Sequence, residues 1–427
     1  MTVEFLKEVK GKYWPDDHDR HLIDIVLPKL MSKINTYIDE HKLEATPMLV
    51  GSIAKGTYLH NPDADIFILF DKGMKKERMG EIAVDMGKTV LDHSTVSYAE
   101  HPYSKGEYEN LKTDIVPAYK ISHGSEIISA VDRTPFHTEF VKNSVNEDIL
   151  EDIRLIKAFS KGIGVYGSDS RVKGFSGYLL ELMVIYYGGF LKVLKNASNW
   201  KRGIRVEMVP SAKDFDNPLV WIDPVDNGRN VASALSTDNF YLFISACKHY
   251  LEKPKKEFFL PRPHDPLNFE QIKRAFEHRR THAVAVSIDR PDLVDDILYP
   301  QMDKALKSIE IGLKSSDFTV YRSIHHAGEK LTFLLEVDQI VLPKVQVHEG
   351  PPANHPNSKD FIKRWTNSVE TFSKPYLYNS RWQVDVCRKY STIQEFLQEQ
   401  IPNMSLGKNL DLLMENGLSL IHISEPT

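Results

Sequence analysis

The stretch GSIAKGTYLHNPDADIFILF, residues 51–70, decides the fold of this chain. The apolar run TPMLV before it predicts a strand that ends in a turn made by Gly51 and Ser52. The run ADIFILF, residues 64–70, predicts a second, strongly apolar strand. The residues that carry chemistry lie in the turn and at the start of this second strand.

Acidic side chains gather at the start of the second strand. Asp63 and Asp65 are two positions apart, so on a strand their side chains share one face. Two carboxylates this close repel each other unless a cation lies between them. The run LKTDIVPAY, residues 111–119, predicts a third strand closed by Pro117, and its Asp114 can supply a third carboxylate. Such a set is suited to two Mg²⁺ ions for an in-line displacement at phosphorus.

An Asp-x-Asp pair alone is a weak signal. The chain contains a second pair, Asp214 and Asp216, in a stretch rich in Pro and Asn that follows no Gly-Ser turn, and we interpret that pair as solvated surface. The plainer alternative for Asp63 and Asp65 is an exposed turn before a strand. The Gly-Ser turn, the apolar strand and the later Asp114 together favour a metal site.

Composition limits the class of protein. A chain of 427 residues with 41% hydrophobic residues is long enough for two to four globular domains. The two cysteines, Cys247 and Cys387, lie far apart and outside any metal-ligand spacing, which favours a reducing compartment, and we expect a cytoplasmic location. The net charge of -5 is unevenly distributed, with acidic residues in excess over 1–150 and basic residues in excess over 151–282. This distribution suits a metal-binding centre beside a phosphate-binding region, or reflects ordinary surface variation.

No segment has the features of a membrane span or a signal peptide. The N-terminal sequence is charged and lacks an apolar core. The longest uncharged apolar stretch, residues 182–191, is too short to cross a bilayer and predicts a buried helix. We therefore expect no membrane partner.

Further patterns predict an α+β architecture. Helical spacing extends from about Asp19 to Lys42, where Pro28 marks a kink or a later helix start. Helical patterns also dominate from Asn146 to Leu194 and near Ile393 to Asn416. After the Pro-rich stretch at 258–266, the order β-α-β-β suggests a small ferredoxin-like unit.

These patterns divide the chain into a catalytic palm of mixed sheet over 1–148, a helical central domain over 149–257 and a C-terminal body and tail over 258–417. The last residues, 418–427, match the translation of a sequencing adapter, so we leave them out of the predicted fold.

Ordered blocks of the sequence resemble a known family. GSIAKGTYLHNPDADIFILF is similar to the signature of polymerase-β-like nucleotidyltransferases. DIVPAY, SAVDRTPFH, LIKAFSKGIGVYGSDSRVKGFSGYLLELM, DPVDNGRNVASALS, HEGPPA and SRWQVDV resemble successive blocks of archaeal class I CCA-adding enzymes, from about residue 5 to 416. Many members have Glu where this chain has Asp63, and often Arg where it has Lys55. The first change keeps the ligand type, and the second keeps charge without the bidentate fork of arginine.

The resemblance implies an activity and a set of roles. The activity is addition of C, C and A to the 3′ end of tRNA from CTP and ATP without a nucleic-acid template, with two Mg²⁺ ions. The implied metal ligands are Asp63, Asp65 and Asp114. The implied nucleotide-binding residues are Gly51, Ser52, Lys55, Thr134, His137, Lys157, Tyr166 and Arg229. Arg229 is the candidate for reading the incoming base.

Each nucleotide-binding candidate also has a plainer interpretation. Lys157 could lie on a solvated helix face, His137 could be a satisfied core histidine, Tyr166 could pack in a loop, and Arg229 could be an exposed turn residue. Two other functions remain open. One is a related RNA nucleotidyltransferase such as a poly(A) polymerase or an oligonucleotide-signal synthase, and the other is a catalytically dead RNA-binding relative. The expected partner is tRNA, with a possible homodimer.

Overall fold

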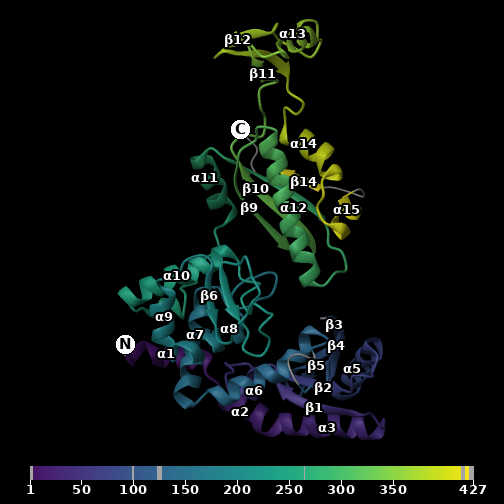
Figure 1. Ribbon diagram of the computed structural model, residues 1–427, viewed down its shortest axis with the longest axis vertical. Helices are drawn as coiled ribbons and strands as arrows, with labels where there is room; N and C mark the ends of the chain where they lie inside the picture. Colours follow the sequence, from purple (N-terminus) through teal and green to yellow (C-terminus); the bar gives the residue numbers. More distant parts are fainter. Residues whose placement is uncertain (1–2, 99–100, 123–126, 264, 415–418, 423–427) are drawn as a thin grey trace. The chain divides into compact units, whose positions relative to one another are not determined.

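The computed structural model describes residues 3–98, 101–122, 127–263, 265–414 and 419–422. The chain divides into two compact units, Met1–Pro263 and His264–Thr427 (Figure 1), and the division falls within the Pro-rich stretch. The finer division of the first unit near residue 148 stays a prediction.

A mixed five-stranded sheet forms the palm. Its strand order is β1-β2-β5-β4-β3. The strands are β1 (Ala45–Val50), β2 (Ala64–Phe70), β3 (Asp92–Tyr98), β4 (Pro102–Tyr108) and β5 (Leu111–Tyr119). The central strand β2 pairs antiparallel with β1 and parallel with β5. The strands β1, β2 and β5 follow the apolar runs of the sequence, whereas the polar hairpin of β3 and β4 was not predicted.

The two faces of β2 have different environments. Ile66 and Ile68 are buried in a large core with residues of α3 (Leu27–Glu40) and α5 (Lys76–Val90). Phe67 lies on the other face in a small apolar cluster, and Asp65 shares its side of the strand. Strand alternation therefore separates the acidic face of β2 from its main core, as the sequence predicted.

Pro117 does not end β5, contrary to our expectation. The strand continues to Tyr119, and Pro117 pairs with Ile68 of β2. Pairing with β4 ends at Ile115, so the opposite side of β5 is already an unpaired edge at Pro117. A residue without an N–H is tolerated at such a position.

The predicted helix from Asp19 to Lys42 is interrupted by a π turn. The N-terminal helices are α1 (Val3–Tyr13), α2 (Asp17–His21), the π turn η1 (Leu22–Val26) and α3. Pro28 lies in the first turn of α3 and lacks the N–H that would bond to the carbonyl of Asp24. The wider π turn before it accommodates this missing bond, so the chain stays helical from Asp17 through Pro28 to Glu40 and does not start a new helix there.

Helices surround a second large core in the first unit. The elements are η3 (Ala130–Arg133), α6 (Thr134–Ser144), α7 (Glu147–Gly162), α8 (Gly177–Tyr187), α9 (Phe190–Ala197), β6 (Ile204–Glu207), β7 (Leu219–Ile222), α10 (Thr237–Glu252) and η4 (Lys256–Phe258). The side chain of Asn146 caps α7 at the backbone N–H of Ile149, which agrees with the predicted start of that helix.

The apolar stretch 182–191 belongs to two helices rather than one. Gly188 has a φ of +75° and ends α8, and α9 leaves at a bend of 95°. Among the described residues no single helix is long and apolar enough to cross a membrane, although α8 and α9 together pass that test by length and composition. Leu182, Met183 and Phe190 from this stretch are buried in the second core.

The second unit contains the predicted ferredoxin-like arrangement. Its four-stranded sheet has the order β14-β8-β10-β9. The helices and strands of this arrangement are α11 (Phe269–Arg279), β8 (His282–Asp289), α12 (Asp295–Ser315), β9 (Val320–Ala327), β10 (Lys330–Val337), α14 (Ile393–Gln400), η5 (Ile401–Asn403), α15 (Lys408–Met414) and β14 (Ser419–His422). The C-terminal helical pattern is broken at Pro402 and at Gly407, whose φ is +127°.

Strand β14 corrects one expectation. It lies in the segment 418–427 that we left out of the fold, yet Ser419–His422 pair antiparallel with β8. Among the described residues, β14 is the strand that pairs with this edge of β8, and the pairing satisfies backbone groups of β8. Residues 418 and 423–427 lie outside the described residues, and the adapter origin of the segment stays a prediction.

A second small sheet is inserted between β10 and α14. It has the order β11-β13-β12, and its elements are β11 (Val345–Pro352), α13 (Ser358–Thr366), β12 (Tyr376–Tyr378) and β13 (Arg381–Cys387). The blocks HEGPPA and SRWQVDV lie on its adjacent strands β11 and β13.

Candidate active site

Three carboxylates meet where β2 and β5 run side by side. Asp65 and Asp114 are directly opposite each other in the parallel register, and Asp63 lies just before β2. The sheet register therefore brings Asp65 and Asp114 together, and the loop before β2 adds Asp63. An open pocket of about 460 Å³ is lined by Asp63 and Asp114, with Lys105 and Lys112 among its other residues.

Gly51 makes room for one of these carboxylates. It has a φ of +70°, and a Cβ at this position would lie 2.0 Å from Oδ2 of Asp65. Any side chain would therefore collide with the carboxylate as well as strain the backbone. This close approach explains why glycine begins α4 (Gly51–Lys55), the short helix that contains Ser52.

The carboxylate site carries negative charge that nearby lysines compensate only in part. Burial, followed by the charges of Asp114 and Asp63, raises the pKa of Asp65 to about 6. Burial also raises the pKa of Asp114, although Lys105 of β4 opposes this shift from 3.2 Å. Carboxylate oxygens are the ligands that divalent cations such as Mg²⁺ prefer. Their convergence and mutual repulsion fit a metal site.

Lys55 and Lys157 both turn toward one buried carboxylate. Glu181 of α8 is 1% exposed and accepts from Lys55 at 2.7 Å, from Lys157 at 2.8 Å and from the hydroxyl of Thr57 at 2.6 Å. Lys157 also donates to the carbonyl of Thr57, so it is not a solvated helix residue. Burial acts against ionisation of Glu181, but Lys157 and Lys55 outweigh it and lower the pKa of Glu181 to about 2.

Tyr166 lies beside this network. Burial raises the pKa of Tyr166 to about 12, so its hydroxyl stays protonated at neutral pH. A Cβ at Gly177 would lie 3.1 Å from that hydroxyl oxygen and 3.8 Å from Nζ of Lys157. The exposed Lys161 lies 4.8 Å from the centre of the Tyr166 ring. Tyr166 therefore borders both a buried and an exposed lysine.

Two of the predicted nucleotide-binding residues, His137 and Arg229, contact a second buried carboxylate, Asp223. It is 0% exposed and accepts from His137 at 2.9 Å, from Arg229 at 2.8 Å and from the hydroxyl of Tyr178 at 3.2 Å. His137 stacks on Tyr178 with ring centres 3.9 Å apart. Burial lowers the pKa of His137 although Asp223 opposes this, which favours a neutral ring that donates from Nε2.

Arg133, which directly precedes α6, forms an ion pair with the turn that contains Arg229. Its Nε lies 2.7 Å from Asp226, in the turn that contains Arg229. Thr134, the first residue of α6, follows Arg133 directly. The structure thus joins the blocks of His137 and Arg229, which are distant in sequence, through the ion pair of Arg133 with Asp226 and the hydrogen bond of His137 with Asp223.

Sequence reasoning missed Glu181, Asp223 and Lys105. An acidic residue inside the apolar run GYLLELMV was a usable signal for Glu181, because buried carboxylates require partners. Lys105 carried no local signal, since its pairing with Asp114 depends on the register of β4 against β5. The control pair Asp214 and Asp216 is exposed, as expected.

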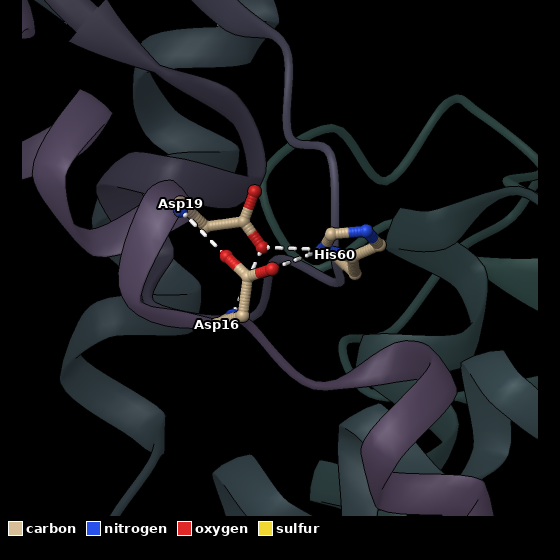
Figure 2. Close-up of side chains that lie close together, drawn as sticks. All are labelled: Asp16, Asp19 and His60. Carbon is tan, nitrogen blue, oxygen red and sulfur yellow. Dashed lines mark hydrogen bonds and ion pairs between the residues drawn. The ribbon is translucent and has the colours of Figure 1, made fainter.

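Another acidic cluster lies outside these strands. Asp16, Asp19 and His60 bring their side chains together between α2 and the loop before β2 (Figure 2). Asp16 caps α2, and Asp19 bonds back to the backbone of Asp16. His60 lies 2.7 Å from Asp19, so the cluster has internal partners for its charges.

Comparisons with known proteins follow the same order along the chain. A nucleotidyltransferase domain matches residues 31–137, a second domain of tRNA nucleotidyltransferases matches 151–260, and the C-terminal domain of CCA-adding enzymes matches 279–422. The fold, the carboxylate site and these matches thus define a nucleotidyltransferase, a class that uses divalent metal ions, and the predicted α+β fold with a nucleotidyltransferase palm is confirmed.

The curated relatives narrow this class. The chain is 35% identical to the CCA-adding enzyme of Thermoplasma volcanium over 405 residues, which cover 95% of this chain and 90% of the relative. It is 37% identical to the CCA-adding enzyme of Methanocaldococcus jannaschii over 432 residues, covering 96% and 94%. The chain belongs to the family of CCA-adding enzymes. Among solved structures, Cid1 poly(U) polymerase gives a TM-score of 0.48 at 14% identity, covering 60% of this chain and 97% of that chain.

Proposed function

We propose that this protein adds C, C and A in turn to the 3′ end of tRNA, using CTP and ATP and releasing pyrophosphate, with two Mg²⁺ ions held by Asp63, Asp65 and Asp114. The observation that carries this proposal is the convergence of the three carboxylates on β2 and β5 in a member of the CCA-adding family. Ions held by these residues would neutralise charge on the triphosphate and would lower the pKa of the attacking 3′-hydroxyl.

The protein's own residues prepare the site for a triphosphate. Lys55 and Lys157 share the single charge of Glu181, which leaves the buried network with a net positive charge. The charge of Lys55 opposes part of the rise in the pKa of Asp65, so this cation acts on the carboxylate site. Ser52, in the turn of α4, can donate its hydroxyl to phosphate oxygens, and Tyr166 remains a donor because its hydroxyl stays protonated.

We assign the choice of the incoming base to the loop around Asp223. Cytosine and adenine both carry an exocyclic amino donor beside a ring nitrogen acceptor, and uracil and guanine have the opposite pattern. Arg229 can donate to that ring nitrogen, because its side chain remains 34% exposed while one guanidinium nitrogen is held by Asp223. His137 and Thr134 from α6 are proposed as further nucleotide contacts.

Incubation of the protein with tRNA lacking its CCA end, CTP, ATP and Mg²⁺, followed by sequencing of the 3′ ends, tests the function. We expect tails that stop at CCA. Runs of A would indicate a poly(A) polymerase, and unextended tRNA would indicate a dead RNA-binding relative. The Asp63→Ala variant should give no extension under the same conditions. The homodimer stays a prediction, which light scattering of the purified protein tests.

A further inference from the structure

We propose that Asp19 is a positioning residue, which holds the loop before β2 and so sets the direction of Asp63. The inference rests on the proposed function, in which Asp63 is a metal ligand. It concerns a residue far away in sequence, at the start of the helices that precede the palm.

Asp63 is not held by the sheet itself. Strand β2 begins at Ala64, which pairs with Thr113 of β5, and its pairing with β1 begins at Asp65. The backbone of Asp63 therefore lies before the first rung of either ladder. Its direction depends on the residues that enter the strand, whereas Asp65 is fixed by pairing on both sides.

Asp19 holds those entering residues. Its carboxylate is 0% exposed, with Oδ2 2.7 Å from Nδ1 of His60, and its Oδ1 accepts from the backbone N–H of Asn61 at 3.1 Å (Figure 2 shows the His60 contact). The backbone N–H of His60 donates to the carbonyl of Tyr13 at 2.7 Å. The loop is thus tied at two successive residues to the N-terminal helices.

The held loop has a specific backbone conformation. Asn61 has a φ of +56°, in the left-handed region, which asparagine adopts more readily than most residues other than glycine. Pro62, which is buried, restricts the next backbone angle, and Asp63 follows directly. The two bonds from Asp19 therefore stabilise a sharp turn immediately before the ligand.

The same contacts account for the acidic cluster without a cation. Oδ2 of Asp19 also accepts from the backbone N–H of Asp16 at 3.1 Å, so each of its oxygens has a donor. Asp16 contributes a helix cap, because its side chain accepts from the N–H of Asp19. Asp16 contacts the loop only through a 3.7 Å approach to His60, which makes it a matched control for Asp19.

The test measures Mn²⁺ binding to the metal-free protein by electron paramagnetic resonance, alongside kcat and KM for CTP and the unfolding temperature. We expect Asp19→Asn and Asp19→Ala to raise the dissociation constant for Mn²⁺ about tenfold, as loss of partners that orient metal ligands does elsewhere. KM for CTP at saturating metal should change less than twofold. Asp16→Ala should bind Mn²⁺ like the wild type, even if its unfolding temperature falls.

Two further variants separate the possible failures. His60→Ala alters a partly exposed side chain and should weaken Mn²⁺ binding in the same direction, so the test stands even if both Asp19 variants fail to fold. Wild-type Mn²⁺ affinity in the folded Asp19 and His60 variants, with affinity lost in Asp63→Ala, overturns the positioning role alone. Wild-type affinity in Asp63→Ala as well overturns the proposed metal site.

Discussion

Asp65 of β2 and Asp114 of β5 are direct neighbours across a parallel pair of strands. Side chains at such positions project from the same face of the sheet, so the register alone forces two carboxylates together. Lys105 compensates Asp114, and burial beside other carboxylates raises the pKa of Asp65 to about 6. The site is therefore electrostatically strained until cations bind.

The first prediction concerns the loss of either carboxylate of this pair. Asp65→Ala or Asp114→Ala should lower nucleotide addition by about a thousandfold or more, since metal ligation contributes several kcal/mol to the transition state. The unfolding temperature of the metal-free protein should not fall, because repulsion is relieved. Rates of CTP incorporation and differential scanning calorimetry check the two parts. Asp214→Ala, at an exposed loop position, is the control, and near-normal activity in Asp65→Ala contradicts the site.

The second prediction concerns pH. Because folding raises the pKa of Asp65 from 3.8 to about 6, protonation of Asp65 stabilises the metal-free fold fully below pH 3.8, and this contribution is lost as the pH rises through about 6. Asp65→Asn mimics the protonated form, so it should be more stable than the wild type at pH 7. The difference should shrink toward pH 4. An equal difference at both pH values contradicts the assignment.

Protons should also compete with metal at the same carboxylate. The apparent affinity for Mn²⁺ should therefore decrease as the pH falls below about 6, since ligands must be deprotonated to bind. A titration of Mn²⁺ at pH 5 and pH 7 measures this decrease.

The third prediction concerns Gly51. Gly51→Ala places a methyl group against Oδ2 of Asp65 in a left-handed backbone conformation. We expect an unfolding free energy lower by more than about 1 kcal/mol together with a large loss of activity. Gly73→Ala is the control, because a Cβ there meets nothing within 4 Å. Equal behaviour of the two variants in denaturant titrations and activity assays contradicts the role of Gly51.

The fourth prediction concerns the buried network of Glu181. Glu181→Gln leaves Lys55 and Lys157 without their carboxylate, and breaking a buried pair in this way costs about 3–5 kcal/mol. Urea denaturation of the variant measures this loss of unfolding free energy. Glu81→Gln, which breaks an exposed pair with Arg78, should change it by less than about 1 kcal/mol.

The lowered pKa of Glu181 gives the same network a pH dependence. Folding lowers this pKa from 4.5 to about 2, so its contribution to stability is present above pH 4.5 and is lost as the pH falls toward 2. The difference in unfolding free energy between the wild type and Glu181→Gln should therefore decrease as the pH falls from 4.5 toward 2.

The fifth prediction concerns base choice. Arg229→Ala should lower kcat/KM for CTP and ATP by an amount equivalent to about 1–3 kcal/mol, while kcat/KM for UTP changes little. The preference for CTP and ATP over UTP should therefore decrease. Arg229→Lys keeps charge but not the guanidinium fork and should recover little. Steady-state kcat/KM for each nucleotide is the measurement. Arg202→Ala, a largely exposed arginine paired with Asp216 at 3.5 Å, is the control. Full selectivity in Arg229→Ala places base reading elsewhere.

Local patterns in the sequence determined a large part of this protein. The two-residue spacing predicted that Asp63 and Asp65 share one face, and Asn146 marked the start of α7. Such features depend on neighbouring residues, so spacing and capping preferences reveal them. Gly188, which breaks an apolar stretch, was a local signal that we did not use.

Only the tertiary structure decided which charges meet. Glu181 accepts a hydrogen bond from Lys55, which is 126 residues away in the sequence. Asp223 is hydrogen-bonded to His137, which is 86 residues away. Asp19 reaches the loop before Asp63 in the same way, across 42 residues to Asn61. No local period encodes these contacts, because they depend on how helices and strands pack over long distances. Burial then determines their strength, since a carboxylate removed from water must be paired with donors or cations.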